Sequence, residues 1–275
     1  MPEQITPLVS VVIPCYNCEG FIEETIRSVL GQTYRNLELV VVNDGSVDGS
    51  LAVIEKLWAS HNFILINQAN AGVSAARNAG ILRASGTVIA LLDADDWMYP
   101  ENIEEKIRLM TDSDADLVYS AAEITDAKLN PTGIFPGANP DHFGEELFVF
   151  ANPPVPSPSS AVVKKSVLLD AGLFNPAFSV AADLDMWIRV SFIGKVARVG
   201  KPLVKYRIVQ GSMNTNINGQ VKDVSAIIEK YQLHPKVKPY IRRFRKAFYY
   251  SIIGNSYHTR NIGRFVRYAF KYLLS

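Results

Sequence analysis

The chain of 275 residues carries 28 Lys and Arg against 27 Asp and Glu, and 48% of it is hydrophobic, so it can bury a sizeable core as one large domain or two small ones. No window approaches the roughly 18 consecutive apolar residues of a transmembrane helix, and residues 1–7 have neither the basic start nor the apolar run of a signal peptide. We therefore expect a cytoplasmic protein without a membrane-spanning helix.

Strand and helix signals alternate through the first 120 residues. β-Branched and apolar runs predict strands at residues 9–13, 37–42, 63–66, 88–92 and 116–120. Apolar or small residues at helical spacing predict helices at residues 21–30, 51–58 and 73–84, and another from Pro100, where proline suits the first turn. This alternation indicates an α/β fold, a Rossmann-like, mostly parallel sheet with helices on both faces.

The middle of the chain is rich in proline, with seven prolines between residues 130 and 158. Long loops of this kind inside a compact domain are usually functional. Helical patterns return near residues 164–171 and 184–192, followed by a strand pattern near residues 203–208. After Gly219 the chain is expected to be helical.

Charge is distributed unevenly along the chain. Residues 222–275 hold twelve Lys and Arg but two Asp and Glu, whereas residues 1–221 are net acidic. The basic segment mixes cations with aromatic residues, a pattern that suits a helix lying in a membrane interface. Helices packed on the preceding domain, with cations reaching to solvent, explain it equally well. No recognition motif supports nucleic-acid binding.

Three carboxylates follow the strand expected at residues 88–92, namely Asp93, Asp95 and Asp96. Residues i and i+2 of a strand point to the same side, so Asp93 and Asp95 project together and repel each other unless a cation lies between them. Mn²⁺ or Mg²⁺ takes oxygen ligands and often joins a few carboxylates to substrate phosphates. Ligands of open α/β sheets bind at such strand ends. The alternative is a solvated loop before the helix at Pro100.

Cys15 and Cys18 form a C-x-x-C motif, which near a strand-to-helix turn can be a redox pair. One such pair cannot fill a four-ligand zinc site. The turn at residues 14–20 lacks the G-x-G-x-x-G pattern of a dinucleotide-dependent oxidoreductase, which argues against that class.

Four blocks in this order and spacing resemble the nucleotide-sugar-binding half of family 2 glycosyltransferases with the GT-A fold. They read VVIPCYN (residues 11–17), VVNDGS (41–46), NAGVSAARNAG (70–80) and LDADD (92–96). The resemblance continues more loosely to about residue 214. It implies an inverting hexosyl- or N-acetylhexosaminyltransferase that moves a sugar from a nucleoside diphosphate, with UDP favoured. Its acceptor would be a saccharide or lipid-linked hydroxyl in cell-surface polysaccharide or glycolipid synthesis.

The resemblance also implies roles for individual residues. Asp95 would hold a divalent cation, Mn²⁺ or Mg²⁺, and Asp96 would orient the Asp95 carboxylate. Tyr16 could pack on the base or ribose, Asp44 could accept the N3–H of uracil, and Arg77 could reach the base or diphosphate. The alternatives without a role in ligand binding are an aromatic residue on a surface loop for Tyr16, a turn residue or helix cap for Asp44 and a solvated helix charge for Arg77. The implied donor-binding residues are Pro14, Tyr16, Asn17, Asp44, Gly72, Arg77, Asp93 and Ala94.

A second acidic block, at residues 181–189, resembles the family segment that carries the catalytic base, and the role falls on Asp183. Such a base takes a proton from the acceptor hydroxyl as that oxygen attacks the anomeric carbon. Asp183 also stands where it could cap a helix. Asp185 and Arg189 could form a helix-surface ion pair, and Trp187 is expected in the core or in the acceptor-site wall.

Two positions depart from the family pattern. Ala182 stands where the family usually has Glu, and Val209 stands where it often has a His that helps hold the metal or diphosphate. Metal affinity would be weaker, and a degenerate protein that binds nucleotide sugars without turnover is the alternative function.

We expect a GT-A domain at residues 1–219, divided into a nucleotide-sugar-binding half (1–120) and an acceptor half (121–219). A basic helical extension at residues 220–275 would follow, with possible contact to the inner face of the membrane.

Overall fold

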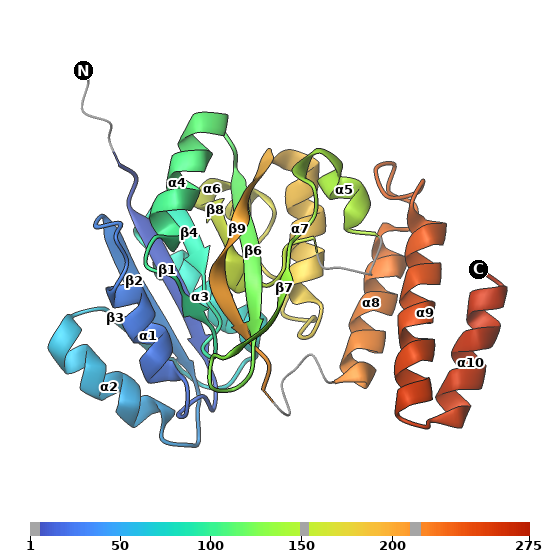
Figure 1. The fold of residues 1–275 in the computed structure, drawn as a ribbon, viewed down its shortest axis with the longest axis horizontal. Coiled ribbons are helices and arrows are strands. Elements are labelled where there is room, and N and C mark those ends of the chain that lie inside the picture. Colours follow the sequence, from blue (N-terminus) through green and yellow to red (C-terminus); the bar gives the residue numbers. More distant parts are fainter. Residues whose placement is uncertain (1–5, 149–153, 210–215) are drawn as a thin grey trace.

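The computed structural model describes residues 6–148, 154–209 and 216–275. Its first part alternates strands and helices as predicted, because the β-branched runs become buried strands and the segments between them pack one helical face on the sheet (Figure 1). These elements are β1 (Val9–Cys15), α1 (Ile22–Leu30), β2 (Leu37–Asp44), α2 (Ser50–His61), β3 (Ile64–Gln68), α3 (Val73–Arg83) and β4 (Val88–Leu91).

The second part is less regular and contains three strands that the sequence did not predict, β5 (Trp97–Met98), β7 (Pro131–Phe135) and β8 (Ala161–Lys164). β7 pairs antiparallel with β6 inside the proline-rich stretch expected to be loop. A strand can begin at Pro131, because proline is tolerated at the first position of a strand or on an edge. The elements are β5 (Trp97–Met98), α4 (Asn102–Ser113), β6 (Leu117–Thr125), β7 (Pro131–Phe135), η1 (Pro140–His142), α5 (Phe143–Glu146), η2 (Pro158–Ser160), β8 (Ala161–Lys164), α6 (Lys165–Asp170), α7 (Ala182–Ile193) and β9 (Val196–Arg207).

All these strands join one sheet of order β3-β2-β1-β4-β8-β6-β9-β5, with β7 attached to β6. The strands β3, β2, β1 and β4 are parallel, as expected of strands linked by crossing helices. β8 runs antiparallel to both β4 and β6, and β9 returns parallel to β6. The predicted α/β class is confirmed; the parallel arrangement holds for the first four strands, and the rest of the sheet is mixed.

Buried side chains form two clusters, one on each face of the sheet, because successive strand residues point to opposite faces. Val12 and Val42 belong to the first cluster, which α3, α5, α6 and α7 cover together with α8 (Ile217–Tyr231) and α9 (Ile241–His258). Val11 and Val41 belong to the second cluster, under α1, α2 and α4. Helices therefore cover both faces, as predicted.

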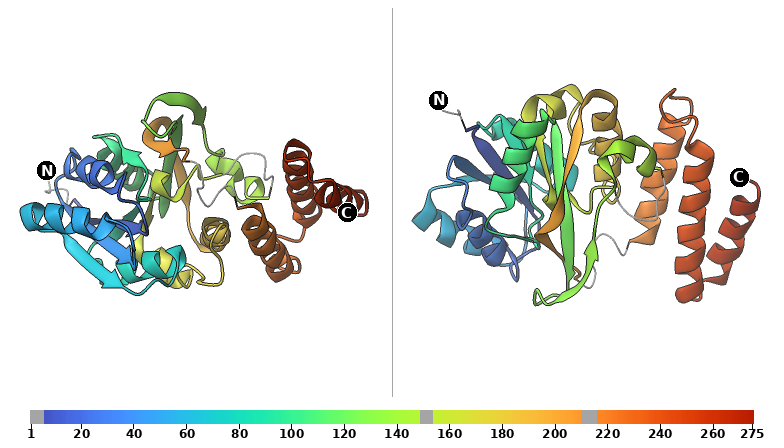
Figure 2. Two further views of the ribbon diagram at one scale, coloured as in Figure 1. Left: turned by 90° about the horizontal axis from the view of Figure 1, so that it is seen from below. Right: turned by 45° about the horizontal axis from the view of Figure 1, so that its top comes forward.

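The last three helices are α8 (Ile217–Tyr231), α9 (Ile241–His258) and α10 (Ile262–Leu273). They lie side by side at one end of the molecule, with α10 outermost (Figures 1 and 2). Val224 of α8 and Phe244 of α9 are buried in the same cluster as α7. The helices expected after Gly219 are present, whereas the domain division at residue 219 stays a prediction. Among the described residues, no helix has the length and apolar character needed to cross a membrane.

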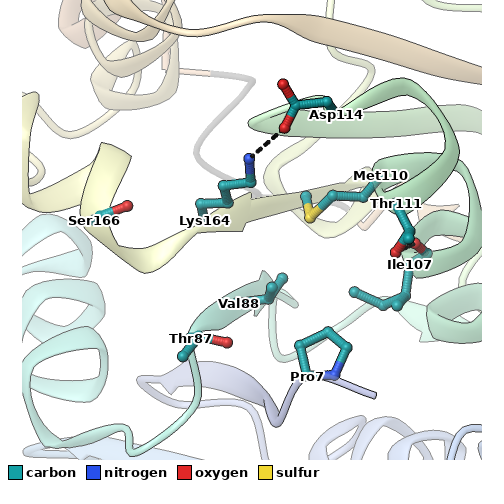
Figure 3. A pocket seen from close by; sticks show the side chains of 9 residues that line it. All are labelled: Pro7, Thr87, Val88, Ile107, Met110, Thr111, Asp114, Lys164 and Ser166. Atoms are coloured by element: carbon teal, nitrogen blue, oxygen red, sulfur yellow. Dashed lines mark hydrogen bonds and ion pairs between the residues drawn. The ribbon is translucent and has the colours of Figure 1, made fainter. Parts of the chain in front are cut away.

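A cavity of about 440 Å³ lies at the amino ends of β1 and β4, where Pro7, Val88, Met110 and Lys164 line it (Figure 3). The ammonium of Lys164 is 3.5 Å from the Asp114 carboxylate beside it. This edge of the sheet is opposite to the loops that follow β1 and β4, so the cavity contains none of the residues predicted to bind the donor.

Lys106 of α4 is fully buried, and its Nζ donates to Asn102 Oδ1 at 3.0 Å. Burial lowers the pKa of Lys106 to about 7, because the ammonium loses its hydration. The unfolded chain keeps this proton up to a pH of about 10.4, so stability should rise with pH between those values, by up to about 1.4 kcal/mol per pH unit.

Lys106→Met should remove this pH dependence, because methionine binds no proton in either state. The free energy of unfolding in urea, measured at pH 7 and pH 9, should rise for the wild type relative to the variant by about 2 to 3 kcal/mol. Parallel pH dependence in the two proteins would show that Lys106 keeps its charge in the folded state.

Candidate active site

The loops after β1 and β2 are joined to each other at the carboxyl edge of the sheet. Asn17 has a left-handed backbone (φ 52°), its Oδ1 accepts the Val47 N–H at 2.9 Å, and its own N–H donates to Ser46 Oγ at 3.1 Å. Pro14 is buried in β1, whereas Tyr16 is 51% exposed. Tyr16 is therefore accessible to a ligand at this edge, and Asn17 shapes the loop around it.

Cys15 and Cys18 are bonded to each other as a disulfide in the same loop, and both are buried.

Asp44, at the end of β2, is buried and organises the loop before α3. Its Oδ1 accepts from Gln68 Nε2 at 2.7 Å and from Ala71 N–H at 3.0 Å, and its Oδ2 accepts from Gly72 N–H at 2.9 Å. Gly72 has a φ of +88°, which only glycine adopts without strain. Recognition of uracil by Asp44 stays a prediction, since these bonds already give its carboxylate a structural role.

Arg77 of α3 is buried rather than solvated, and it lies beside the acidic loop, residues 93–96, which follows β4. Its Nη2 lies 2.6 Å from Asp93 Oδ1, and its guanidinium lies 5.3 Å from the centre of the Phe174 ring. Its buried Nε has no hydrogen-bond partner within the described part of the chain. A buried cation with a spare donor, paired on one side only, is suited to an anionic ligand.

The helix that carries Arg77 can approach the sheet closely because it is lined with small residues. A Cβ on Gly80 would collide with Val12 Cγ1, so a larger residue would push α3 away from β1. This close packing brings Arg77 next to the end of β4.

The acidic loop concentrates negative charge in a partly buried place. Burial and the Asp93 carboxylate raise the pKa of Asp95 to about 6, although Arg207 and Arg77 oppose the rise. Burial, followed by Asp95 and Asp93, raises the pKa of Asp96 well above its ordinary value. The Asp95 carboxylate thus pays a free-energy cost for its charge, which a bound cation would relieve.

Asp96 is 1% exposed and ties three segments together. Its carboxylate accepts from Ser159 Oγ and from the Arg207 N–H at 3.0 Å, and Thr25 Oγ1 donates to the carbonyls of Ala94 and Asp96 at 2.9 and 2.8 Å. Asp96 therefore holds the loop in place, which agrees with the orienting role expected of it. The Ala94 carbonyl likewise serves the loop's own structure.

Ser159 in η2 is a site residue that sequence reasoning missed. Its Oγ accepts the Asp93 N–H at 2.9 Å while it donates to Asp96. It comes directly after the proline-rich stretch of residues 130–158, where neither periodicity nor a motif singles out one serine. The only signal was the proline-rich composition, which marked the segment as functional.

Tyr206 and Arg207, at the end of β9, belong to the segment that the sequence singled out for Val209, but neither was given a role in the site. Burial and the charges of Asp96, Asp93, Asp95 and Asp183 together raise the pKa of Tyr206. The carboxylates after β4 and at the start of α7 therefore both act electrostatically on the phenol. The Arg207 guanidinium lies 2.8 Å from Glu24 and stacks 4.8 Å from the Phe21 ring, buried beneath the acidic loop.

Asp183 lies in the first turn of α7, and the charges of Arg77 and Asp93 act on it. Burial raises its pKa, Arg77 lowers it and Asp93 raises it, so the electrostatic field of the acidic loop reaches Asp183. The helix is capped at Ala181 without a side-chain bond, so the N-cap alternative for Asp183 is wrong; its Oδ1 accepts the adjacent Leu184 N–H at 2.8 Å. The other carboxylate oxygen of Asp183 has no hydrogen-bond partner recorded among the described residues.

The loop that leads into α7 is held from both sides. On α3, Ser74 Oγ donates to the Phe178 carbonyl at 2.8 Å, and the Asn78 amide exchanges two hydrogen bonds with Phe174. On α8, Asp223 Oδ2 accepts three backbone N–H groups at 2.8 to 3.2 Å, from Ser179, Val180 and Ala181. These contacts set where α7 begins and hence where Asp183 lies.

Asp185 is buried, so the predicted surface ion pair with Arg189 is wrong in its location. The pair forms at 2.7 Å, but Asp185 also accepts from Lys230 Nζ and Tyr231 OH of α8, each at 2.8 Å. A carboxylate without exposed surface needs several donors to keep its charge. Trp187 is 2% exposed and lies in the core, one of its two expected places.

The described residues contain no group of three or more His, Cys, Asp or Glu side chains arranged to hold a metal. Mg²⁺ and Mn²⁺ sites for nucleotides need less, since one or two carboxylates and the substrate phosphates complete the coordination with water. Asp95, whose charge is poorly compensated, fits that requirement, with Asp93 next to it. The half-buried Val209 contributes no ligand atom, as its side chain predicts.

Comparison with known proteins agrees with this site. The sequence profile described as "Glycosyl transferase family 2" matches residues 10–171. The chain is 30% identical over 240 residues to a chondroitin synthase of Pasteurella multocida (strain Pm70), covering 85% of this chain and 24% of that protein. It is 33% identical over 215 residues to a hyaluronan synthase of Pasteurella multocida, covering 77% and 21%. The chain therefore spans about a quarter of the length of these relatives.

Two solved structures share the fold. TarS of S. aureus in complex with UDP-GlcNAc gives a TM-score of 0.64 at 15% identity, over 97% of this chain and 91% of that one. The mannosyltransferase PcManGT of Pyrobaculum calidifontis, in complex with GDP-Man and Mn²⁺, gives 0.67 at 18% identity, over 93% and 76%. The predicted GT-A architecture is confirmed by these likenesses, and the profile that matches more than half of the chain shows that this protein belongs to glycosyl transferase family 2.

Proposed function

We propose that the chain is an inverting glycosyltransferase that moves a sugar from a UDP-sugar to a hydroxyl of a saccharide or lipid-linked acceptor. The observation that carries this proposal is the meeting of two acidic segments, from β4 and α7, around Arg77 and Tyr206 at the carboxyl edge of the sheet. Family membership supports the reaction class.

In the proposed reaction Asp183 is the general base. Its carboxylate takes the proton of the acceptor hydroxyl, the acceptor oxygen forms a bond to the anomeric carbon, and the bond from that carbon to the diphosphate oxygen breaks with its electron pair leaving on the diphosphate. Burial raises the pKa of Asp183, which makes its carboxylate a stronger base than that of a solvated aspartate.

On the donor side, Asp95 with Asp93 would hold a divalent cation. When bound, that cation offsets the charge that accumulates on the leaving diphosphate. The spare donor of Arg77 points to a second anion contact. Tyr16 and Asp44 would contact the nucleoside.

The donor and acceptor classes rest on the relatives. TarS is described with UDP and with UDP-GlcNAc, and the two Pasteurella relatives are named chondroitin synthase and hyaluronan synthase. We extend these classes to this chain as cell-surface polysaccharide or glycolipid synthesis. A lipid-linked acceptor would place the enzyme on the cytoplasmic face of a membrane.

A thermal-shift panel with UDP, GDP and UDP-sugars, with and without Mn²⁺, tests the donor assignment. A ligand at a hundredfold excess over its Kd stabilises the folded state by about 2.7 kcal/mol, so UDP with Mn²⁺ should raise Tm by several degrees and GDP by less. A larger shift with GDP than with UDP would refute the uridine assignment.

Turnover separates the enzyme from the binding-only alternative that Ala182 and Val209 suggest. Purified protein with Mn²⁺ should release UDP from a UDP-sugar, slowly with water and faster with a saccharide acceptor. Binding without any release of UDP, across the panel, would establish the degenerate protein instead.

A further inference from the structure

The outermost helix, α10, turns its apolar side to solvent. Its strongly amphipathic sequence places an apolar stripe along one side, and the residues of that stripe are 59% to 78% exposed. The apolar stripe consists of Ile262, Val266, Phe270, Leu273 and Leu274. In a globular protein an amphipathic helix normally buries such a side, so this one is available to a partner.

The opposite side of α10 is already used. Tyr268 is 5% exposed and lies 5.8 Å from Tyr249 of α9, ring centre to ring centre, and Lys271 stands 5.2 Å from the Tyr268 ring. At helical spacing Tyr268 lies on the side away from Val266 and Phe270. α10 is therefore attached to the protein by its aromatic side, which leaves the apolar stripe exposed, and the helix itself lies at the end of the molecule (Figure 1).

The positive charge around the apolar stripe indicates which kind of partner it would bind. After Glu229 the chain has eleven Lys and Arg and no Asp or Glu. Arg267, next to the apolar stripe, is exposed, as are Arg242 and Arg243 of α9. A second copy of the chain would bring the same positive charge against this surface, whereas an anionic bilayer complements it.

We propose that α10 lies in the interface of an anionic lipid bilayer, with the apolar stripe inserted among the acyl chains and the surrounding cations on the headgroups. Helices with a large apolar side and a basic polar side bind in this way. The proposal gives the membrane contact of the proposed function a definite surface, and it rests on that function only for the supply of a lipid-linked acceptor.

The test compares the full chain with Val266→Ser/Phe270→Ser in vesicle co-sedimentation, without donor or metal. Wild-type protein should bind vesicles of phosphatidylcholine with 30% phosphatidylglycerol at least about tenfold better than pure phosphatidylcholine, and 0.5 M salt should weaken the binding. The serine variant should bind the anionic vesicles at least about tenfold more weakly. Its Tm should be unchanged, because both side chains are exposed.

Leu82→Ser/Ile134→Ser is the matched control, since these apolar residues are 59% and 58% exposed on α3 and β7. It should bind vesicles like the wild type. Equal binding by the α10 variant and the wild type would overturn the proposal. So would a wild-type dimer, seen by light scattering, that the α10 substitutions dissociate while vesicles bind neither protein.

The same proteins separate the two proposals. If the protein does not bind vesicles but UDP with Mn²⁺ still raises Tm, only the proposal that α10 binds a bilayer is refuted. If vesicles bind through α10 but no nucleotide raises Tm, only the proposed transfer reaction falls.

Discussion

Asp183→Asn should lower the rate of sugar transfer by about a thousandfold while donor affinity changes by no more than about twofold. Asparagine has the same shape, and its Oδ1 can still accept the Leu184 N–H, so α7 should begin as before. It cannot take a proton from the acceptor. Because burial disfavours the charge of Asp183, the neutral variant should be no less stable than the wild type.

The measurement is steady-state release of UDP with acceptor present, together with the UDP-dependent shift in Tm. Asp170→Asn, which removes an exposed carboxylate from the end of α6, is the control and should retain full activity. Transfer by Asp183→Asn within tenfold of the wild-type rate would assign the base to another group.

Asp95→Asn should abolish the part of donor binding that depends on Mn²⁺ and lower transfer by at least about a hundredfold, because it removes a carboxylate that would hold the cation. The same substitution should stabilise the ligand-free protein. The pKa of Asp95 is raised to about 6, so at pH 7.5 its ionised form costs folding free energy. An upward shift of about two pKa units corresponds to at most about 3 kcal/mol, reduced by solvent screening.

This opposite pair of effects separates a ligand-binding residue from a structural one. Tm of ligand-free Asp95→Asn should exceed that of the wild type, whereas adding UDP with Mn²⁺ should reverse the order. Asp112→Asn, at an exposed position of α4, should change neither value. A Mn²⁺-dependent shift that survives in Asp95→Asn would place the cation elsewhere.

Apart from β5, the elements of the first 120 residues could be predicted because their signals are local. A β-branched run such as that in β1, and the apolar face of α1, depend only on neighbouring residues. β7 could not be predicted in this way, since its residues are mostly exposed and its pairing with β6 is what makes it a strand.

The candidate site was predicted in part. Asp93, Asp95, Arg77 and Asp183 were singled out one at a time, and the structure groups them. Arg77 pairs with Asp93, and the charge of Asp93 raises the pKa of Asp183, because α3 and α7 pack near the end of β4. Ser159 had no motif of its own, and the segment that contains Tyr206 and Arg207 was singled out only for Val209. Each of these three residues acquires its role from a carboxylate far away in the chain.

The C-terminal helices were also predicted only in part. Their basic and aromatic composition was visible in the sequence, but whether they pack on the domain or face a membrane was not. The structure shows both kinds of surface, with α8 holding the loop before Asp183 through Asp223 and α10 exposing its apolar stripe.

The sequence by itself determined the alternation of strands and helices in the first part of the chain, the acidic strand end and the family, because periodicity and short motifs depend on residues close together in the chain. Only the tertiary structure decided which carboxylates are buried, which cation each one meets and which helix face stays exposed. Burial and charge pairing arise between segments distant in the chain, such as β4, η2, α7 and β9, and these meet only when the sheet is assembled.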